Sequence, residues 1–600
     1  MRFLSTLAAS VLGTLIAIAI IVFFGMVILF AFVAAADQTP SVRSGSVMVF
    51  ELKGPIPERV SGDPFMQAFG GEPSFDLAGA ISAIDKAAAD DRIEGIWIKV
   101  RGYSGQWATL EELRNALLRF RESGKPIIAS SEDFAMSEAE YYIASTADSV
   151  FASSQAGFEF NGFYSAAIFF QNTLEKLDIE PQIVRAGRFK SAVEPFTRED
   201  LSPENRLQLT AILESQNQIF MNAIAESRGK SADELAGIVE SQAVLTAIEA
   251  HEHGLIDGLL FEDEVVDIIK QRIGVDEDDD LETISMASYV RVPAKDAGLR
   301  VNTEGEIAVV YAEGAIISGE NGSPSPFSEQ SMGSETMKRA LQEARENDRI
   351  SAVVVRINSP GGSASASDEI WRAIRLTAEE KPVVVSMGGL AASGGYWIAT
   401  AAETIVADPL TLTGSIGVFA MLFDVSGFFE NKLGVTFDDI QTAPYADIFS
   451  GLEPLDDSER AMLERMVDLT YDQFLERVSE SRRLDVAQVD TIGQGRIWTG
   501  AQALEVGLVD SLGTLRDAIR IAARQAELGD GPYRVRVLPR AKTFLEQLTS
   551  GMNARAVKAW MPFTTSPAER AMLEQARALR SAVEFADGVQ ARLPYSITIR

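Results

Sequence analysis

The chain has 600 residues, of which 46% are hydrophobic, so it is long enough to bury more than one core and is not a disordered chain. Its formal net charge of −32 argues against nucleic acid as a partner, because phosphates need clustered lysine and arginine. The absence of cysteine excludes disulfides, a thiolate nucleophile and Cys-ligated metal sites.

The N-terminal segment is the first predicted element. It carries no charge between Arg2 and Asp37, and about 20 apolar residues suffice to cross a bilayer. This stretch exceeds the roughly 7–15-residue apolar core of a cleavable signal. Arg2 precedes it, so the positive-inside rule places the N-terminus in the cytoplasm. We therefore predict a transmembrane anchor over residues 1–40. A cleaved signal peptide, ending at the small residues of AAAD, is the alternative.

After the anchor the sequence repeats itself with an offset of about 255 residues. DDRIEGIWIKVRG, from Asp90, matches NDRISAVVVRINS, from Asn347, and YYIASTADSVFAS matches YWIATAAETIVAD. GLIDGL, from Gly254, matches GLVDSL, from Gly507. These matches predict a first repeat over residues 41–274 and a second over residues 304–530.

Each repeat alternates short β-branched runs with helical patterns, which is typical of βαβ units and a parallel sheet. In the first repeat IWIKV precedes a predicted helix, Leu110 to Phe120, and then PIIAS. In the second, AVVVRI precedes a helix near Asp368–Leu376 and then PVVVSM. The predicted fold class is therefore α/β.

Three further segments complete the chain. Residues 275–303, which begin with the acidic run Asp276 to Asp280, are predicted to connect the repeats. A long helical pattern follows each core, starting at SPENRL and at DDSERA, and its apolar spacing predicts a packed or oligomeric face. Residues 531–600 form a tail with a helix start at Ser566 and an apolar face through Val583, which favours a docking helix over a membrane-binding one.

The two repeats differ at chemically important positions. The first reads RFKSAVEP, with Lys190, where the second reads IFSGLEP, with Phe449. The second reads LAASGGYW, with Ser393, where the first has Glu138. One copy keeps a lysine and the other a serine, which indicates a single composite catalytic site at their junction. A phenylalanine opposite the lysine further predicts that the position is buried.

Histidine is not expected in this site. The chain has only His251 and His253, and the second repeat has Leu504 and Val506 at the matching positions. A position that one copy fills with apolar residues is structural, which argues against a Ser-His-Asp triad and most zinc sites. A serine nucleophile would then need another base, for which lysine is the obvious candidate.

Ser393 follows a strand and a GG turn and stands at a predicted helix start, close to backbone N–H groups. A second glycine turn, Asn358 to Ser363, follows the preceding strand. In a parallel sheet both turns emerge at the same carboxyl edge. This placement makes the backbone of Gly361 or Gly362, together with Gly394, the candidate oxyanion hole.

Lys190 is a base only when neutral, whereas a free lysine titrates near 10.4. Lowering the pKa by ~3 units corresponds to ~4 kcal/mol of desolvation or cationic repulsion. Desolvation would come from the apolar neighbours Phe189, Val193 and Phe196, and repulsion from Arg185 and Arg188 if they point inward. Ser415, in LTGSIGV, is a candidate to orient the lysine through a hydrogen bond.

Together these motifs resemble the long-form signal peptide peptidase A family, also called protease IV, over essentially the whole chain. The resemblance rests on the anchor, the tandem repeat, KSAVEPF, NSPGGS, LAASGGYW and LTGSIG. It implies two ClpP/crotonase-like domains after one transmembrane helix. It also implies a Ser–Lys serine endopeptidase, with Ser393 as nucleophile and Lys190 as general base, and no cofactor or metal.

The resemblance further implies a homotetramer at the inner (plasma) membrane, with the bulk of the chain periplasmic or extracytoplasmic. Its substrates would be apolar peptides left after signal-peptide cleavage, bound in extended form along a strand edge. Three alternatives stay open. They are a crotonase-like acyl-CoA enzyme, a non-catalytic membrane scaffold, and an envelope protease with other principal substrates.

Overall fold

The computed structural model describes residues 39–60, 75–241, 244–300, 302–322, 330–529, 531–540 and 589–593, with seven isolated helical positions between residues 13 and 24. Most of the predicted anchor and the predicted helix from Ser566 to Val583 lie outside these residues. Within the described part of the chain, no helix is both long enough and apolar enough to cross a membrane.

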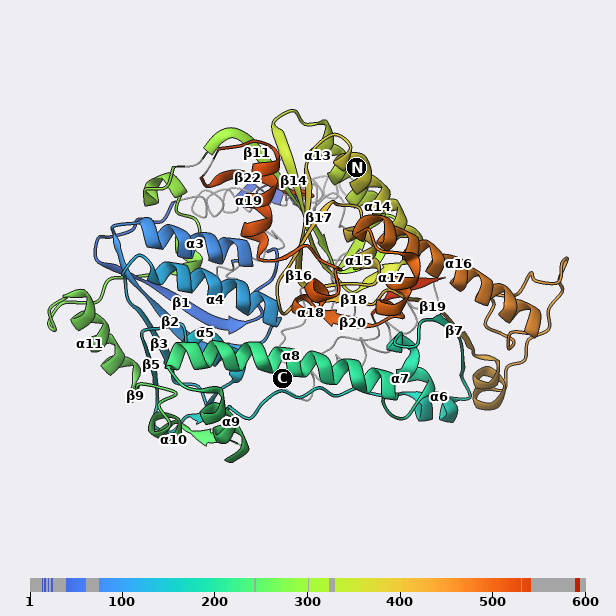
Figure 1. Ribbon diagram of the computed structural model, residues 1–600, viewed down its shortest axis with the longest axis horizontal. Helices are drawn as coiled ribbons and strands as arrows, with labels where there is room; N and C mark the ends of the chain where they lie inside the picture. Colours follow the sequence, from blue (N-terminus) through green and yellow to red (C-terminus); the bar gives the residue numbers. More distant parts are fainter. Residues whose placement is uncertain are drawn as a thin grey trace, which may run out of the picture.

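The first repeat is built on a six-stranded parallel sheet with the order β10-β1-β2-β3-β5-β9. Its strands are β1 (Ser46–Gly54), β2 (Ile93–Tyr103), β3 (Ile127–Ser131), β5 (Ser149–Ala152), β9 (Gly258–Leu259) and β10 (Thr283–Ser285). Helices α3 (Leu77–Ala89) and α4 (Trp107–Arg121) lie side by side against one face (Figure 1). Helix α11 (Glu262–Ile273) packs on the other, so both faces are covered.

The predicted connector is partly structured. Its acidic run is a loop, but β10 lies within it and pairs in parallel with β1. Helix α12 (Met286–Tyr289) then follows, and its Tyr289 belongs to the core of the first repeat. The first repeat therefore draws part of its own sheet and core from the residues that we expected to join the repeats.

The second repeat has a larger sheet with the order β20-β18-β16-β14-β11-β22, to which β17 and β21 add beside β16. Its strands are β11 (Asn302–Glu313), β14 (Ile350–Ser359), β16 (Val383–Ala392), β17 (Thr404–Ala407), β18 (Leu412–Gly414), β20 (Ile497–Thr499), β21 (Ser511–Leu512) and β22 (Tyr533–Leu538). Helices α13 (Ser334–Glu346) and α14 (Ala364–Ala378) cover one face, and α19 (Leu515–Gln525) covers the other. β22 lies beyond the predicted end of the repeat at residue 530.

A third sheet joins three distant parts of the chain, in the order β13-β12-β15-β23-β19-β7. Its strands are β7 (Glu180–Ala186), β12 (Ala315–Ile317), β13 (Ser331–Gly333), β15 (Gly361–Ser363), β19 (Val418–Asp424) and β23 (Gln590–Arg592). β7 comes from the first repeat and pairs antiparallel with β19 of the second, with Ala186 opposite Val418. β23 comes from the C-terminal tail. This sheet is the junction between the repeats.

The remaining elements connect these sheets. A small sheet of β4 (Ala135–Met136), β6 (Gly157–Phe158) and β8 (Leu245–Thr246) extends the first repeat. The long helix α8 (Pro203–Arg228) passes beneath both halves, whereas α16 (Asp457–Arg482) lies on the second (Figure 1). The shorter helices are α5 (Glu138–Ala144), α6 (Gln171–Leu177), α7 (Glu194–Thr197), α9 (Ala232–Ser241), α10 (Ala247–Glu252), α15 (Gly394–Ala399), α17 (Val486–Ile492) and α18 (Gly500–Glu505).

Candidate active site

Ser393 stands where β16 ends and α15 begins, as the sequence predicted. Its backbone has φ +55° and ψ −117°, a conformation that non-glycine residues rarely adopt and that is concentrated at functional sites. The Ser393 N–H donates to Gly414 O at 2.8 Å, which fixes this turn against β18. The side chain is fully buried.

Lys190 reaches Ser393 from the other repeat. It follows β7, whose pairing with β19 carries the first repeat onto the second. Its Nζ lies 2.7 Å from Ser393 Oγ, 3.0 Å from Ser415 Oγ and 3.2 Å from Ser415 O. Lys190 has no exposed surface, and this burial holds the pKa of its amine well below the usual value.

The three partners of Nζ suit a neutral amine. A neutral lysine has two N–H donors and one lone pair, whereas the ammonium form has three donors and no acceptor. Ser415 offers two acceptor oxygens, and the remaining contact is to the Ser393 hydroxyl. Ser415 is itself fixed with φ +52°, and its N–H donates to Arg496 O at 2.7 Å. In the neutral form, two N–H groups have acceptors in Ser415, and the lone pair is then available to the Ser393 hydroxyl.

Two buried polar residues that sequence reasoning missed hold the lysine turn. Glu194, in the KSAVEP motif, accepts hydrogen bonds from Ser202 Oγ at 2.5 Å and Asn205 Nδ2 at 2.9 Å, at the start of α8. Gln208, on α8, donates to Ser191 Oγ at 3.0 Å and accepts from Ile497 N at 3.1 Å. Gln208 therefore ties the residue after Lys190 to β20 of the second repeat.

A glycine in the second repeat also makes room for Lys190. Gly495 has φ +78°, and a Cβ there would lie 2.5 Å from Lys190 N and 2.7 Å from Lys190 Cα. Next to it, Gln494 O accepts the N–H of Phe189 at 2.8 Å. A comparison of the two repeats could have identified Gly495. The second repeat reads IGQGRIWT, with two glycines, where the first reads VESQAVLT, with none.

The candidate oxyanion glycines come together, as expected from two turns at one sheet edge. A Cβ on Gly361, whose φ is +91°, would lie 2.6 Å from Gly394 N. The Gly361 N–H donates to Ser359 Oγ at 3.1 Å, so it is engaged within its own turn. Gly394 is the first residue of α15, where the N–H has no partner within the helix. The backbone N–H groups of Gly362 and Gly394 therefore remain as the candidate oxyanion donors.

Two expectations about the surroundings of Lys190 were wrong. Phe449, the residue aligned with Lys190, is 62% exposed, so it does not mark a buried position in the second repeat. Arg185 and Arg188 are exposed, and Arg185 donates to Lys190 O at 3.3 Å and lies 3.9 Å from Glu194. Burial, rather than cationic repulsion, lowers the pKa of Lys190.

The first repeat has no comparable centre at the equivalent position. Glu138, aligned with Ser393, is buried and accepts the N–H groups of Asn161 at 2.8 Å and Gly162 at 3.2 Å. Burial raises the pKa of this carboxyl. Its side chain thus fills the turn that Ser393 uses in the second repeat, and Phe160 stands at the position aligned with Ser415.

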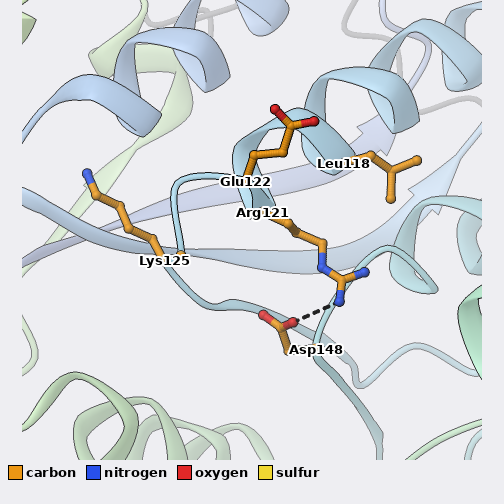
Figure 2. Close-up of a pocket in the computed structure, with 6 residues that line it drawn as sticks. Leu118, Arg121, Glu122, Lys125 and Asp148 are labelled. Carbon is orange, nitrogen blue, oxygen red and sulfur yellow. Dashed lines mark ion pairs between the residues drawn. The ribbon is translucent and has the colours of Figure 1, made fainter.

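Figure 2 shows a surface pocket elsewhere, lined by Leu118, Arg121, Glu122, Gly124, Lys125 and Asp148. It lies between the end of α4 and the starts of β3 and β5, where Arg121 pairs with Asp148 at 3.2 Å. Ligand sites of parallel α/β sheets form at the carboxyl edge, and this pocket is at the amino edge. The Ser393–Lys190 pair is the better candidate site.

Comparison with known proteins points to one family. The model of peptidase family S49 matches residues 119–276 and 375–529, and a Clp protease model matches residues 328–407. The chain is 33% identical to "Serine protease SPPA, chloroplastic" of Arabidopsis thaliana, over 86% of this chain and 74% of that protein. It is 35% identical to "Protease 4" of Salmonella typhi, over 76% of this chain and 72% of that protein. It is 34% identical to "Protease 4" of Haemophilus influenzae, over 75% of this chain and 72% of that protein.

These matches agree with the observed architecture. The two S49 segments fall in the two repeats, and the Clp protease match covers α13, β14, α14 and the Ser393 turn. The predicted tandem of ClpP-like α/β domains is therefore confirmed.

Proposed function

Because the chain belongs to peptidase family S49 and is an SppA-type serine protease, we propose that Ser393 is its nucleophile and Lys190 its general base. The observation that carries this proposal is the 2.7 Å contact between their side-chain atoms, both fully buried and each supplied by a different repeat. A serine with a positive φ and a lysine with a lowered pKa are what an activated nucleophile and its base require.

The mechanism follows from these contacts. Neutral Lys190 takes the Ser393 proton while Oγ attacks the scissile carbonyl carbon. The N–H groups of Gly362 and Gly394 stabilise the oxyanion, and the protonated lysine then gives its proton to the leaving amine. Water, activated by the same lysine, hydrolyses the acyl-enzyme and restores the serine. Ser415 keeps Nζ in place throughout.

The shape of the site suits an extended peptide. β15, next to the glycine turns, and β19 are separated by the width of one strand, which β23 occupies here. A peptide in this position gains backbone hydrogen bonds from the strand edge and pockets for alternate side chains. The side chains of Ala591 and Leu593 on β23 pack in two hydrophobic core clusters. We propose apolar peptides, including remnants of cleaved signal peptides, as the substrates.

We also propose that the enzyme is held in the inner membrane by residues 1–40. The support is the uncharged stretch between Arg2 and Asp37, with its preceding positive charge. The N-terminus would be cytoplasmic and the two repeats would lie on the opposite side. Apolar peptides released within that membrane would then meet the groove directly.

We also propose a head-to-tail assembly, on the basis of the repeat. The segment 435–441 lies 255 residues after β7, and the segment 163–169 lies 255 residues before β19, yet neither forms a strand in the described structure. Both expose large apolar side chains, with Tyr164 63%, Ile168 56%, Phe437 44% and Ile440 99% exposed. We propose that 435–441 of one copy pairs with 163–169 of the next, as β7 pairs with β19. A heterologous contact of this kind gives a ring when its rotation closes and a filament when it does not, and we propose the closed homotetramer.

The first experiment uses full-length protein in detergent and a quenched peptide taken from an apolar signal-peptide core. Ser393→Ala and Lys190→Ala should each lower kcat by at least about 10³-fold, because they remove the nucleophile or its base. The control variants Ser450→Ala and Lys176→Ala alter exposed residues outside the site and should cut normally.

The outcomes are distinct. Loss of cutting in both site variants, with unchanged assembly size, supports the dyad. If either variant cuts at the wild-type rate, the assignment of that residue is wrong. If the wild type cuts unrelated peptides but no apolar one, the proposed substrate class fails while the dyad stands.

A further inference from the structure

A tight turn of the second repeat, residues 493–496, lies against the lysine segment and against the residue that holds its amine. The turn leads from α17 into β20. On one side, Gln494 O accepts the N–H of Phe189, the residue before the lysine, at 2.8 Å. On the other side, Arg496 O accepts the N–H of Ser415 at 2.7 Å. The turn therefore bridges the backbone of the proposed base and the backbone of its hydroxyl partner.

Glycines allow the turn to pack this closely. A Cβ on Gly187, just after β7, would lie 2.5 Å from Gln494 C, and one on Gly417 would lie 2.8 Å from Gly495 Cα. The N–H of Gly495 also donates to Ile416 O at 2.7 Å. Because these contacts are between backbone atoms, a displacement of the turn would displace both of the segments that it touches.

Gln494 combines an unusual backbone conformation with a hydrogen-bonded side chain. Its φ is +51°, a left-handed value that costs a non-glycine residue free energy and is concentrated at functional sites. Its N–H donates to the hydroxyl of Tyr471 at 3.2 Å, and its Nε2 donates to the same hydroxyl at 3.4 Å and to Asp490 Oδ1. The Tyr471 hydroxyl donates to that Oδ1 at 2.6 Å. Residues of α16, α17 and the turn thus form one closed network.

This glutamine occurs in only one of the two repeats. Where the second repeat reads IGQGRIWT the first reads VESQAVLT, so Ser241 stands in place of Gln494. The Ser241 hydroxyl donates to Ile238 O at 2.8 Å, within its own helix. Tyr471 is buried, and this burial raises the pKa of its hydroxyl, which therefore keeps its proton and donates at neutral pH. The network belongs to the half of the molecule that holds the nucleophile.

We propose that Tyr471 is a positioning residue: through Asp490 and Gln494 it fixes the turn, and with it the place of the lysine amine. The proposal rests on the Ser–Lys mechanism proposed above and adds a residue that acts on the base through the backbone. Displacement of a reacting group by about 1 Å costs on the order of 10²-fold in rate. A loosened turn would also bring water closer to Lys190, which would return its pKa toward the ordinary value.

The test compares Tyr471→Phe and Gln494→Gly with wild type, using full-length protein in detergent and the quenched apolar peptide. The first variant loses only a hydroxyl, and the second loses the amide while glycine accepts the positive φ. Each should lower kcat about 10- to 10²-fold with little change in KM. The half-maximal rate should move to higher pH, because a base with a higher pKa becomes neutral at higher pH. The double variant should be no slower than the slower single variant, since both changes break one network.

Tyr141→Phe is the matched control. Tyr141 is buried in the first repeat and donates to Leu255 O, so this variant also loses one buried tyrosine hydrogen bond. It should lower stability without moving the pH profile. The charged groups beside the two segments, Arg188, Glu194 and Arg496, are the same in every variant. A shift in the profile therefore reports a change in the surroundings of the lysine.

The outcomes separate the positioning role from the proposed function. A wild-type kcat in both network variants overturns the positioning role, and so does a lower kcat with an unmoved pH profile, which a general loss of stability would give. If Lys190→Ala cuts like wild type in the same assay, the proposed function fails and the positioning role fails with it. If Lys190→Ala is inactive while both network variants cut normally, only the positioning role fails. Gln494→Gly decides the outcome if Tyr471→Phe does not reach the wild-type assembly size.

Discussion

At the scale of single residues, the site depends on a lysine whose amine is desolvated when the protein folds. The amine of Lys190 is fully buried among Ser393, Ser415 and apolar neighbours, and that burial keeps its pKa low. Burying an ammonium costs free energy, so the residue that makes the proposed base also destabilises the fold. Stability and activity are therefore opposed at this position.

This opposition predicts how stability depends on pH. An unfolded lysine titrates near 10.4. Between the lowered pKa of folded Lys190 and that value, the unfolded chain binds one more proton than the folded chain. The free energy of unfolding should therefore rise with pH in this window, by about 1.4 kcal/mol per pH unit from this residue. Lys190→Met should remove that rise and be the more stable protein at pH 7.

Denaturant unfolding in detergent between pH 7 and 10 measures the effect as a difference between variants. Lys176→Met, which replaces an exposed lysine, should keep the wild-type slope. Equal slopes for wild type and Lys190→Met would show that Lys190 is charged in the folded protein, contrary to the proposed mechanism.

At the scale of elements, α8 aligns the two halves of the site. It begins at the carboxylate of Glu194 and passes Gln208 beneath the lysine turn. Farther along, Ser215 Oγ lies 3.0 Å from Thr499 Oγ1, and Gln502 donates to Ala211 O at 3.2 Å. One helix of the first repeat thus contacts β20 and α18 of the second. Its position decides where Nζ meets the serine.

Gln208→Leu should therefore lower kcat with little change in KM. The substitution keeps the volume but loses the hydrogen bonds to Ser191 and Ile497, and displacement of a reacting group by about 1 Å costs on the order of 10²-fold in rate. The pH at which the rate reaches half its maximum should also move, since the lysine's surroundings change. Gln218→Leu, exposed on the same helix, is the matched control. An unchanged pH profile would show that Gln208 has no positioning role.

At the scale of the whole molecule, buried charge and strand pairing hold the repeats together. Arg356 of β14 is fully buried and bonds Glu58 of the first repeat through Nη2 at 2.6 Å and Nε at 2.9 Å. Glu112, on α4, lies 2.7 Å from the same guanidinium. Removing one partner of such a buried group leaves an uncompensated charge and typically costs 3–5 kcal/mol. The repeats are therefore built to stay in one arrangement.

The same pairing that joins the repeats within a chain predicts the contact between chains. Ile168→Asp and Ile440→Asp each place a charge in one of the two segments proposed to pair, so each should convert the assembly to smaller species. Light scattering in detergent measures the mass. Leu118→Asp changes an exposed apolar residue at the pocket of Figure 2 and should leave the assembly intact. Unchanged mass in both segment variants would exclude the head-to-tail contact.

Much of the fold and of the candidate site was predictable from the sequence, because those features are local or occur in both repeats. The α/β class, the helices within α4 and α14, and the turns that hold Ser393 and the glycines follow from periodicity and from comparing the two copies. Lys190 stood out because one copy keeps it and the other does not. Gln208 was missed, because nothing in a helical pattern shows which side chain will cross to another strand.

What only the tertiary structure decided is which distant segments meet. The register of β7 on β19 brings Lys190 to Ser393, and the placement of β23 brings Ala591 to the glycine turns. The burial of Phe449 was predicted wrongly for the same reason. Aligned positions of the two repeats share a local fold, but they do not share the segments that pack against them. The sequence by itself determined the two folds and the chemical groups, through hydrophobic pattern and residue type. Strand pairing between segments hundreds of residues apart depends on which sheet edges remain free once both cores have formed. That pairing, and not the local sequence, determines which residues meet in the site.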